Sequence, residues 1–414
     1  MLNLSEQFVY DLCKKSFLSL WSYPNPVRQQ DNKELCDILV VCDPYIVILS
    51  VKKIHYHTLL DKNIAVKRWE RRAINESVKQ VYRAQGWITG GKKIVTCHKG
   101  REIKFPDLKD VKIHRVAVAL GSQGEVTISP RDFGKGFVHV YDEISAKLLI
   151  RELDTITDFV EYLAAVETLL TQNKKIVVTG GAGEEDLLAF YLQNNRSFPS
   201  NFGILVMDGT FWKGFSASSA FKARKEADRI SYLWDTMIET FATEVLAGKL
   251  EYESNPSETE LALRTIAKEH RFERRILSQL FDDLITNTPK DEGKARLTRS
   301  TSGVTYVFLV SPRTVDRETR RSELGLRCYV ARSITGDHIV VGIVTEHYDP
   351  SGYSFDACYL RIDDWKEANQ KWAEETQQKF RFFINVSKET LGFAEYPSSV
   401  PTSEGHDYSD ANTT

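Results

Sequence analysis

Residues 33–53, KELCDILVVCDPYIVILSVKK, constrain the fold of this chain more than any other stretch. Two continuous apolar runs flank Asp43-Pro44, and such runs are typical of strands that are buried on both faces. Reversal of the chain at this dipeptide would join the two runs in an antiparallel hairpin in which Cys42 pairs with Tyr45. The sequence therefore predicts a hairpin within a buried sheet.

Three polar residues interrupt this apolar hairpin: Asp37, Ser50 and Lys52. In the predicted register Asp37 falls opposite Ser50, and the two-residue alternation of a strand puts Lys52 on the same face as Ser50. Directly opposed residues lie about 4.5–5.5 Å apart at Cβ, so the three side chains converge at one edge of the sheet. Because an unpaired buried charge is costly, this set must be paired, bound to a metal or placed at an opening.

This arrangement resembles the core of the PD-(D/E)xK nucleases. Such cores run helix, strand with Asp, strand with (Asp/Glu)-x-Lys, helix and strand. In that order the chain presents the amphipathic segment 4–21, Asp37, Ser50-Val51-Lys52, the helical segment 63–87 and the strand-like run 113–120. The resemblance implies an α/β fold: a restriction-endonuclease-like mixed sheet flanked by helices, followed by a second, smaller α+β domain.

The resemblance also implies a hydrolase that cleaves phosphodiester bonds of DNA or RNA with Mg²⁺ or Mn²⁺. Asp37, with Glu6 from the first helix, would hold the metal, which polarises the phosphodiester and lowers the pKa of a bound water. Lys52 would orient that water or stabilise charge in the transition state. Ser50 stands where the motif has an acid, and we expect its hydroxyl to hold a metal-bound water.

Ser50 is a departure from the motif, because a hydroxyl is a weak metal ligand. Glu34 is the nearest other carboxylate in sequence, but on a continuous strand its side chain would point to the face opposite Asp37. Glu34 contributes only if the chain bends before the strand, so Glu6 is the preferred second acid. The alternative function is a catalytically inactive nuclease-fold protein that binds nucleic acid or a protein partner as a sensor. An unrelated fold with a structural Asp–Lys pair is also open.

The whole chain further resembles a family of uncharacterised bacterial proteins. The shared stretches are SFLSLWSYPNP, KELCDILVV, DFGKGFVHV, ELDTITDFV, ARKEADRISYLWD and SGVTYVFLV. Some nuclease-core proteins of this kind belong to phage-defence systems, so by analogy the resemblance implies an antiviral effector.

The charge distribution points to a nucleic-acid partner. Residues 52–104 carry 14 Lys/Arg against four Asp/Glu, whereas the whole chain has a net charge of −2. Such a local excess indicates a surface for a polyanion, although a solvated helix face is the alternative. We expect segment 63–87 to bind nucleic acid through its polar side chains: Lys67, Arg68, Arg71, Arg72, Lys79, Gln80 and Arg83. Its Trp69, Tyr82 and Trp87 are more typical of a core than of base stacking.

The domain organisation follows from a polar stretch at 248–260. We expect residues 1–250 to form the nuclease-like domain with elaborations, and residues 258–395 to form an α+β accessory or sensor domain. Residues 396–414 contain no Lys or Arg and many Ser, Thr, Pro and Asp. This composition predicts a disordered tail.

Two other segments carry local predictions. The Arg-rich run 314–327 predicts a helix, and the following apolar residues 328–332 predict a strand. The glycine-rich stretch 177–188 resembles the strand, loop and helix start that cradle a phosphate, but it lacks the Lys-Ser/Thr of a P-loop. We therefore interpret it as a structural turn.

Composition places the protein among ordinary soluble proteins, with 42% hydrophobic and 27% charged residues. The six cysteines are scattered without a CxxC pair, which favours reduced, structural thiols over a disulfide framework or a zinc site. The sequence shows neither a secretory signal nor an apolar run of membrane-spanning length. We therefore expect a cytoplasmic protein with no membrane partner, and a homo-oligomer is open.

Overall fold

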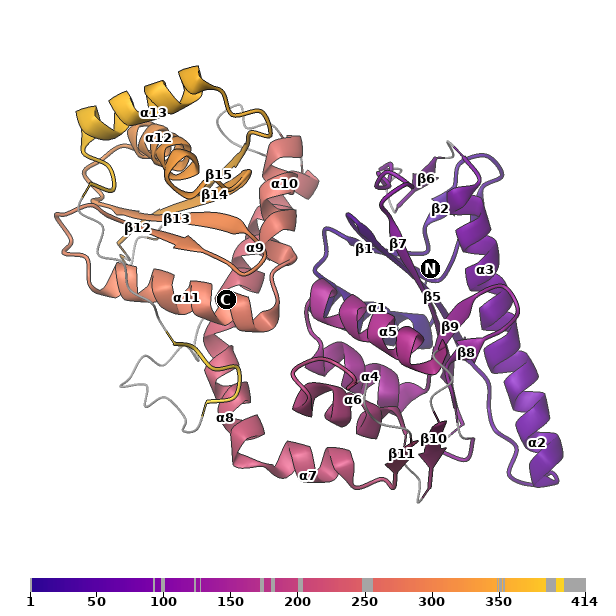
Figure 1. The fold of residues 1–414 in the computed structure, drawn as a ribbon. Helices are drawn as coiled ribbons and strands as arrows, with labels where there is room; N and C mark the ends of the chain where they lie inside the picture. Colours follow the sequence, from indigo (N-terminus) through magenta and orange to yellow (C-terminus); the bar gives the residue numbers. More distant parts are fainter. Residues whose placement is uncertain are drawn as a thin grey trace.

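A mixed six-stranded sheet forms the centre of the N-terminal half of the protein (Figure 1). Its strand order is β1 (Ser22–Pro24), β4 (Ile38–Cys42), β5 (Tyr45–Lys53), β7 (Lys112–Leu120), β9 (Phe137–Tyr141) and β8 (Arg131–Asp132). The pairs β5–β7 and β7–β9 are parallel and the other pairs antiparallel. This computed structural model describes residues 2–91, 94–97, 101–122, 124–126, 128–171, 175–179, 183–199, 204–247, 256–347, 349, 352, 354–384 and 392–397.

The predicted hairpin is formed by β4 and β5. The pair Cys42–Tyr45 lies next to the turn, as predicted, and Ile38–Leu49 is the last pair of the ladder. Every residue of β4 is buried, and in β5 the buried run extends from Ile46 to Val51. The apolar runs thus occupy the interior of the sheet, as expected for strands that are covered on both faces.

Helices cover both faces of this sheet (Figure 1). Along β7, Val116 and Val118 join the cluster that includes α1 (Leu4–Phe17), α4 (Glu143–Glu152) and α5 (Ile156–Thr171), whereas Ala117 and Ala119 join the cluster on the other face. That second face is covered by α2 (Lys62–Trp69), the π-helical segment η1 (Glu70–Asn75) and α3 (Glu76–Thr89). The α/β class and the mixed sheet flanked by helices are therefore confirmed.

Smaller elements surround the main sheet. One three-stranded sheet consists of β2 (Val27–Arg28), β3 (Lys33–Glu34) and β6 (Val95–Thr96). A parallel pair, β10 (Lys175–Val178) and β11 (Ile204–Met207), lies beside α6 (Glu184–Gln193). The chain then passes to the C-terminal half through α7 (Phe211–Ala217), α8 (Ser219–Ala227), the 3₁₀ turn η3 (Asp228–Ser231) and α9 (Tyr232–Ala247).

The C-terminal half contains a four-stranded sheet. Its order is β12 (Lys294–Arg299), β13 (Val304–Ser311), β14 (Ile339–Glu346) and β15 (Phe355–Arg361), and among these pairs only β13–β14 is parallel. Helices α12 (Arg317–Thr335) and α13 (Glu367–Phe380) lie on one side, and α10 (Pro256–Ala267) and α11 (Arg271–Thr286) on the other (Figure 1).

The strand predicted at 328–332 is wrong, because these residues continue α12. Their apolar side chains belong to a helical repeat in which Leu324, Cys328 and Ala331 pack on the sheet. The contact is close: a Cβ at Gly342 of β14 would lie 2.5 Å from Cys328 Sγ. A short apolar run fits a strand and a buried helix equally well, and only the packing separates them.

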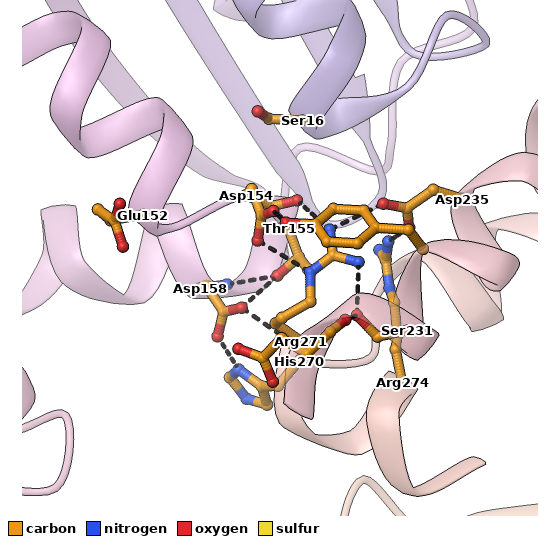
Figure 2. A network of polar contacts seen from close by, with 12 residues as sticks. Ser16, Glu152, Asp154, Thr155, Asp158, Ser231, Asp235, His270, Arg271 and Arg274 are labelled. Atoms are coloured by element: carbon orange, nitrogen blue, oxygen red, sulfur yellow. Dashed lines mark hydrogen bonds and ion pairs between the residues drawn. The ribbon is translucent and has the colours of Figure 1, made fainter. Parts of the chain in front are cut away.

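A buried polar network joins the two halves (Figure 2). Asp158 of α5 accepts hydrogen bonds from the backbone N–H of Arg271, at 3.0 Å, and from His270 Nδ1, at 2.6 Å. The Arg271 side chain in turn donates to Asp154 at 2.9 Å and to Asp235 at 2.8 Å. One hydrophobic cluster also runs from α1 through the main sheet to β13 and β14. We call residues Asp154, Asp158, Asp235, His270 and Arg271 the inter-half network.

The predicted boundary and tail can be placed only in part. Residues 248–255 and 398–414 lie outside the described residues, whereas 256–260 begin α10. Tyr396, the first residue of the predicted tail, packs on the fold, with the Arg224 guanidinium 5.5 Å from its ring centroid. Arg224 Nη1 also donates to its hydroxyl at 3.2 Å. The folded region thus reaches at least Pro397, two residues into the predicted tail.

Two further expectations concern composition. The six cysteines are all free, and four of them are buried. No helix of the described residues is both long enough and apolar enough to cross a membrane.

Candidate functional site at the open end of the hairpin

The centre of the site is the carboxylate of Asp37, which is 2% exposed. Asp37 lies one residue beyond Ile38–Leu49, the pair of the ladder farthest from the turn. Its Oδ2 accepts the backbone N–H of Val51 at 2.5 Å. The Asp37 side chain therefore supplies a hydrogen bond to β5 at a position beyond the end of β4. Ser50 Oγ lies 3.3 Å from Oδ2, and Lys52 Nζ lies 3.6 Å away. The predicted convergence of Asp37, Ser50 and Lys52 is confirmed.

Gln80 of α3 completes the cluster from the helix above. Its Nε2 donates to Asp37 Oδ1 at 2.9 Å, and its Oε1 accepts the Ser50 hydroxyl at 2.7 Å. Because the serine has one proton and the amide has both a donor and an acceptor, these two bonds orient all three groups. Gln80 therefore contacts the polar site directly, whereas the cations that the sequence grouped with it are exposed.

Glu34 is the carboxylate that sequence reasoning set aside. It belongs to β3 in the small sheet, and the chain bends at Asp37 before β4 begins, so Glu34 and Asp37 do not lie on one continuous strand. This bend brings Glu34 to Asp37. Partial desolvation, a hydrogen bond with Asp37, and the charges of Asp37 and Glu6 raise the pKa of Glu34 to about 7. We call Glu34, Asp37, Ser50, Lys52 and Gln80 the hairpin-end cluster.

The paired carboxyl groups fit a divalent cation. The hydrogen bond and the charge of Asp37 help to raise the pKa of Glu34, as expected when two acids lie close together. Carboxylate oxygens are also the ligands that Mg²⁺ and Mn²⁺ prefer. The donor set of the hairpin-end cluster is therefore compatible with the predicted metal.

Glu6 is placed differently from Glu34. Its carboxylate closes a capping box at the start of α1, where it accepts from Asn3 N at 3.0 Å and from Asn3 Nδ2 at 2.6 Å. It lines, together with Lys52, a hollow beside the N-terminus of α1, and its charge reaches Glu34. The role of Glu6 as a metal ligand stays a prediction, while Glu34 is the acid with direct contact to Asp37.

A hollow opens beside the hairpin-end cluster and has basic groups on its rim. Glu34, Lys52 and Gln80 line it together with Arg28 of β2 and Arg83 of α3. Sequence reasoning missed Arg28 because nothing in its local pattern indicates that β2 approaches α3. Guanidinium groups bind anions such as phosphate through paired hydrogen bonds.

The predicted basic side chains are exposed, and they divide between two sides of the helix. Three of them line one hollow with Lys135: Arg71, Lys79 and Arg83. Two line another with His55 and His57: Arg68 and Arg72. Lys67 is also exposed, and Lys79 pairs with Glu76 at 2.7 Å. A π-helical segment such as η1 shifts the register of a helix, so the cations do not form one stripe.

The aromatic residues of the helix belong to the fold. Trp69 is 1% exposed, and its indole N–H donates to the Ile54 carbonyl at 2.8 Å. Tyr82 and Trp87 are half-buried against the same core cluster. This arrangement confirms the core interpretation over base stacking.

Two further features are the exposed pair His55 and His57 and the glycine-rich stretch 177–188. The His55 and His57 rings meet edge to face at 5.4 Å, and the described residues offer no third metal ligand there. Residues 180–182 of the glycine-rich stretch lie outside the described residues. In its later part, Glu184 accepts the Tyr162 hydroxyl at 2.6 Å, and Asp186 accepts the backbone N–H of Gly209 at 2.7 Å. These bonds support the structural-turn interpretation.

No protein-family model, curated protein or solved structure matches this chain. The resemblance to nuclease cores therefore stays a prediction, based on the order of the elements and on the residues of the hairpin-end cluster.

Proposed function

We propose that the protein is a metal-dependent nuclease that hydrolyses phosphodiester bonds of DNA or RNA. The single observation that carries this proposal is the hairpin-end cluster. A buried aspartate contacts a second acid whose pKa is near 7, and Lys52 lies 3.6 Å from the aspartate at the mouth of a hollow. Placing two acids and a lysine together at a sheet edge has a desolvation cost, which a purely structural role does not explain.

Each residue of the hairpin-end cluster has a distinct task in this proposal. Asp37 and Glu34 would hold Mg²⁺ or Mn²⁺, which when bound polarises the phosphodiester and lowers the pKa of a water. Lys52, a third of whose side chain is exposed, can reach both Asp37 and a phosphate in the hollow. Ser50 and Gln80 fix the Asp37 carboxylate by the bonds described above, so that its orientation does not depend on the metal.

A second candidate is a nuclease-fold protein that binds nucleic acid without cleaving it. The observation in its favour is that Asp37 is already well supplied with donors from Val51, Gln80 and Lys52. A carboxylate satisfied in this way has less need of a cation. Binding would then depend on the exposed cations of α2, η1 and α3.

The test of catalysis uses end-labelled single- and double-stranded DNA and RNA with Mg²⁺, with Mn²⁺ or with a chelator. We expect metal-dependent cleavage by the wild type and a loss of more than about 100-fold in Lys52→Ala, because a group that acts on transition-state charge is worth that much. Lys53→Ala is the matched control, since Lys53 is the next residue of β5, is exposed, and alternates to the other face.

Three outcomes separate the candidates. Cleavage that depends on Lys52 and not on Lys53 supports the nuclease. Binding without cleavage in either metal supports the second candidate. A wild-type protein that neither binds nor cleaves DNA or RNA defeats both.

Binding has its own test, which is the salt dependence of affinity. The logarithm of the affinity should fall linearly with the logarithm of salt, with a slope of about −0.9 per phosphate neutralised. Arg68→Glu, Arg71→Glu and Arg72→Glu should each weaken binding of all sequences alike. Arg229→Glu is the control, because Arg229 is 75% exposed on η3 and outside the basic helix. An affinity unaffected by salt or by the three reversals would make the basic face a solvated surface.

A further inference from the structure

A second group of metal-binding side chains lies apart from the hairpin-end cluster. His114 of β7, His139 of β9 and Glu167 of α5 each offer a ligand atom, and these atoms all lie within 4.8 Å of one another. Among the described residues, no other group of three His, Cys, Asp or Glu side chains comes as close.

The two clusters occupy opposite faces of the main sheet. His114 lies on the same face of its strand as Val116, and His139 lies on the same face as Tyr141. Val116 and Tyr141 both belong to the hydrophobic cluster under α5. Ser50 instead lies on the same face as Ile48, which belongs to the hydrophobic cluster under α3. An ion bound by His114, His139 and Glu167 would therefore lie on the opposite face of the sheet from the hairpin-end cluster.

Each histidine has one buried ring nitrogen that no described residue satisfies. His114 is 7% exposed and His139 1% exposed, yet His114 Nδ1 and His139 Nε2 are buried without a hydrogen-bond partner among the described residues. Leaving such an atom unpaired costs about 1–3 kcal/mol. The other nitrogen of His139 lies 3.3 Å from the Tyr141 hydroxyl. A partner on one ring nitrogen is the usual support for a histidine that binds metal through the other.

Burial also leaves these histidines in the state that binds metal. Desolvation, helped by the charges of Arg115 and Lys112, lowers the pKa of His114 to about 4. Desolvation, His114 and Arg115 likewise hold the pKa of His139 well below its ordinary value. Both imidazoles are therefore neutral at pH 7 and keep a lone pair for coordination.

We infer that His114, His139 and Glu167 form a binding site for a divalent transition-metal ion, with Zn²⁺ as the best-fitting ion. Two imidazoles and one carboxylate suit Zn²⁺ and its neighbours, whereas Mg²⁺ takes oxygen ligands. Three protein ligands leave a fourth position open, which fits the half-exposed setting of Glu167.

The three ligand atoms need to move only a little closer together to bind one ion. Metal–nitrogen bonds of about 2.0–2.1 Å place tetrahedral donors about 3.3 Å apart, somewhat closer than the present limit of 4.8 Å. Glu167 can supply the difference by rotation, because its side chain is long and half-exposed on α5. The ion would tie α5 to the neighbouring parallel strands β7 and β9.

Titration of the full-length, metal-free protein with Zn²⁺ tests this inference. Isothermal calorimetry should give one site, and Glu167→Gln or His139→Phe should weaken it by more than about 100-fold, because even outer-shell partners are worth 10- to 100-fold. The double variant His55→Ala/His57→Ala is the matched control for adventitious histidine binding, since that exposed pair lies elsewhere on the surface.

A second readout protects the test from folding defects. Zn²⁺ that binds only the folded state should raise the Tm of the wild type. Glu167→Gln is a near-isosteric change at a half-exposed helix position, so it should fold normally and lose the Tm rise. The inference is overturned if Zn²⁺ binds Glu167→Gln and His139→Phe as tightly as the wild type. It is also overturned if binding disappears when His55 and His57 are replaced, or if the wild type binds no Zn²⁺.

Discussion

Two buried aspartates, Asp37 and Asp158, are almost equally hidden from solvent, at 2% and 1% exposure. Asp158 lies between the two halves of the molecule, where its carboxylate contacts His270, the Arg271 backbone N–H and Thr155 (Figure 2). Arg196 also pairs with this carboxylate. Asp158 faces full positive charge from Arg196, and its pKa is well below the ordinary value, because Arg196 and His270 outweigh the effect of desolvation.

Asp37 has a different kind of neighbourhood. Its partners are a backbone N–H, a serine, an amide and one partly exposed lysine at 3.6 Å, and a second acid touches it. A buried carboxylate that is closed in by cations stabilises a fold, whereas one that shares an opening with another acid has capacity left for a ligand. Burial alone therefore does not distinguish a structural acid from a functional one, and the partners do.

The largest expected difference between the two aspartates is in cleavage. Asp37→Asn should lower the metal-dependent cleavage rate by about 1,000-fold or more, roughly 4 kcal/mol of transition-state stabilisation, because an amide replaces a charged metal ligand. Asp158→Asn should leave the rate of the folded protein within a few-fold of the wild type. Single-turnover cleavage at a temperature where both variants are folded measures this. Equal losses in the two variants would remove the functional distinction.

The next difference concerns stability and has the opposite order. Asp158→Asn should cost about 3–5 kcal/mol, because it removes the buried negative charge that Arg196 and His270 both contact. Asp37→Asn should cost about 1–2 kcal/mol, since the amide oxygen can still accept the Val51 N–H, whereas the bond from Gln80 and the charge opposite the partly exposed Lys52 are lost. Urea denaturation at pH 6 gives both values. A costlier Asp37→Asn would mean that the hairpin-end cluster is mainly structural.

The inter-half network should also make stability depend on pH. The hydrogen bond and charge of Asp158 outweigh desolvation and raise the pKa of His270, so the contribution of His270 is present below its ordinary pKa of 6.5 and is lost as pH rises through the folded value. The lowered pKa of Asp158 acts in the opposite sense: its contribution is present above 3.8 and is lost as pH falls through the folded value. The network is thus strongest between these limits.

Urea midpoints measured at pH 6 and pH 8 check this dependence. The wild type should lose stability over this interval, and His270→Gln, which cannot titrate, should lose less. An unchanged loss in His270→Gln would show that other groups cause the pH dependence.

The smallest expected difference is between the hydroxyl groups beside the two aspartates. Thr155 Oγ1 donates to Asp158 at 2.8 Å and accepts the Asp158 backbone N–H at 3.1 Å at the start of α5. Thr155→Ala should therefore cost about 1–2 kcal/mol, as expected for the loss of a cap. Ser50→Ala, which loses one bond to Gln80, should cost about 1 kcal/mol. Denaturation curves that show Ser50→Ala as the costlier change would contradict this order.

Much of the main sheet was predictable because strand geometry is local. A side chain alternates between faces with every residue, and a turn sets the register of the hairpin that it closes. The apolar runs and Asp43-Pro44 therefore sufficed to pair Cys42 with Tyr45 and to bring Asp37, Ser50 and Lys52 together. The same locality explains the wrong strand at 328–332, since five apolar-rich residues do not distinguish a strand from one face of α12.

By itself, then, the sequence determined the hairpin, its register and the face that carries the acid, the hydroxyl and the lysine. Only the tertiary structure decided which groups from elsewhere meet them: Glu34 through a bend before the hairpin, Gln80 from a helix 30 residues away, and Arg28 from a separate small sheet. The same holds for His114, His139 and Glu167, which come from two strands and a helix. Local patterns specify the direction of a side chain along its own element, whereas contacts between elements depend on how those elements pack.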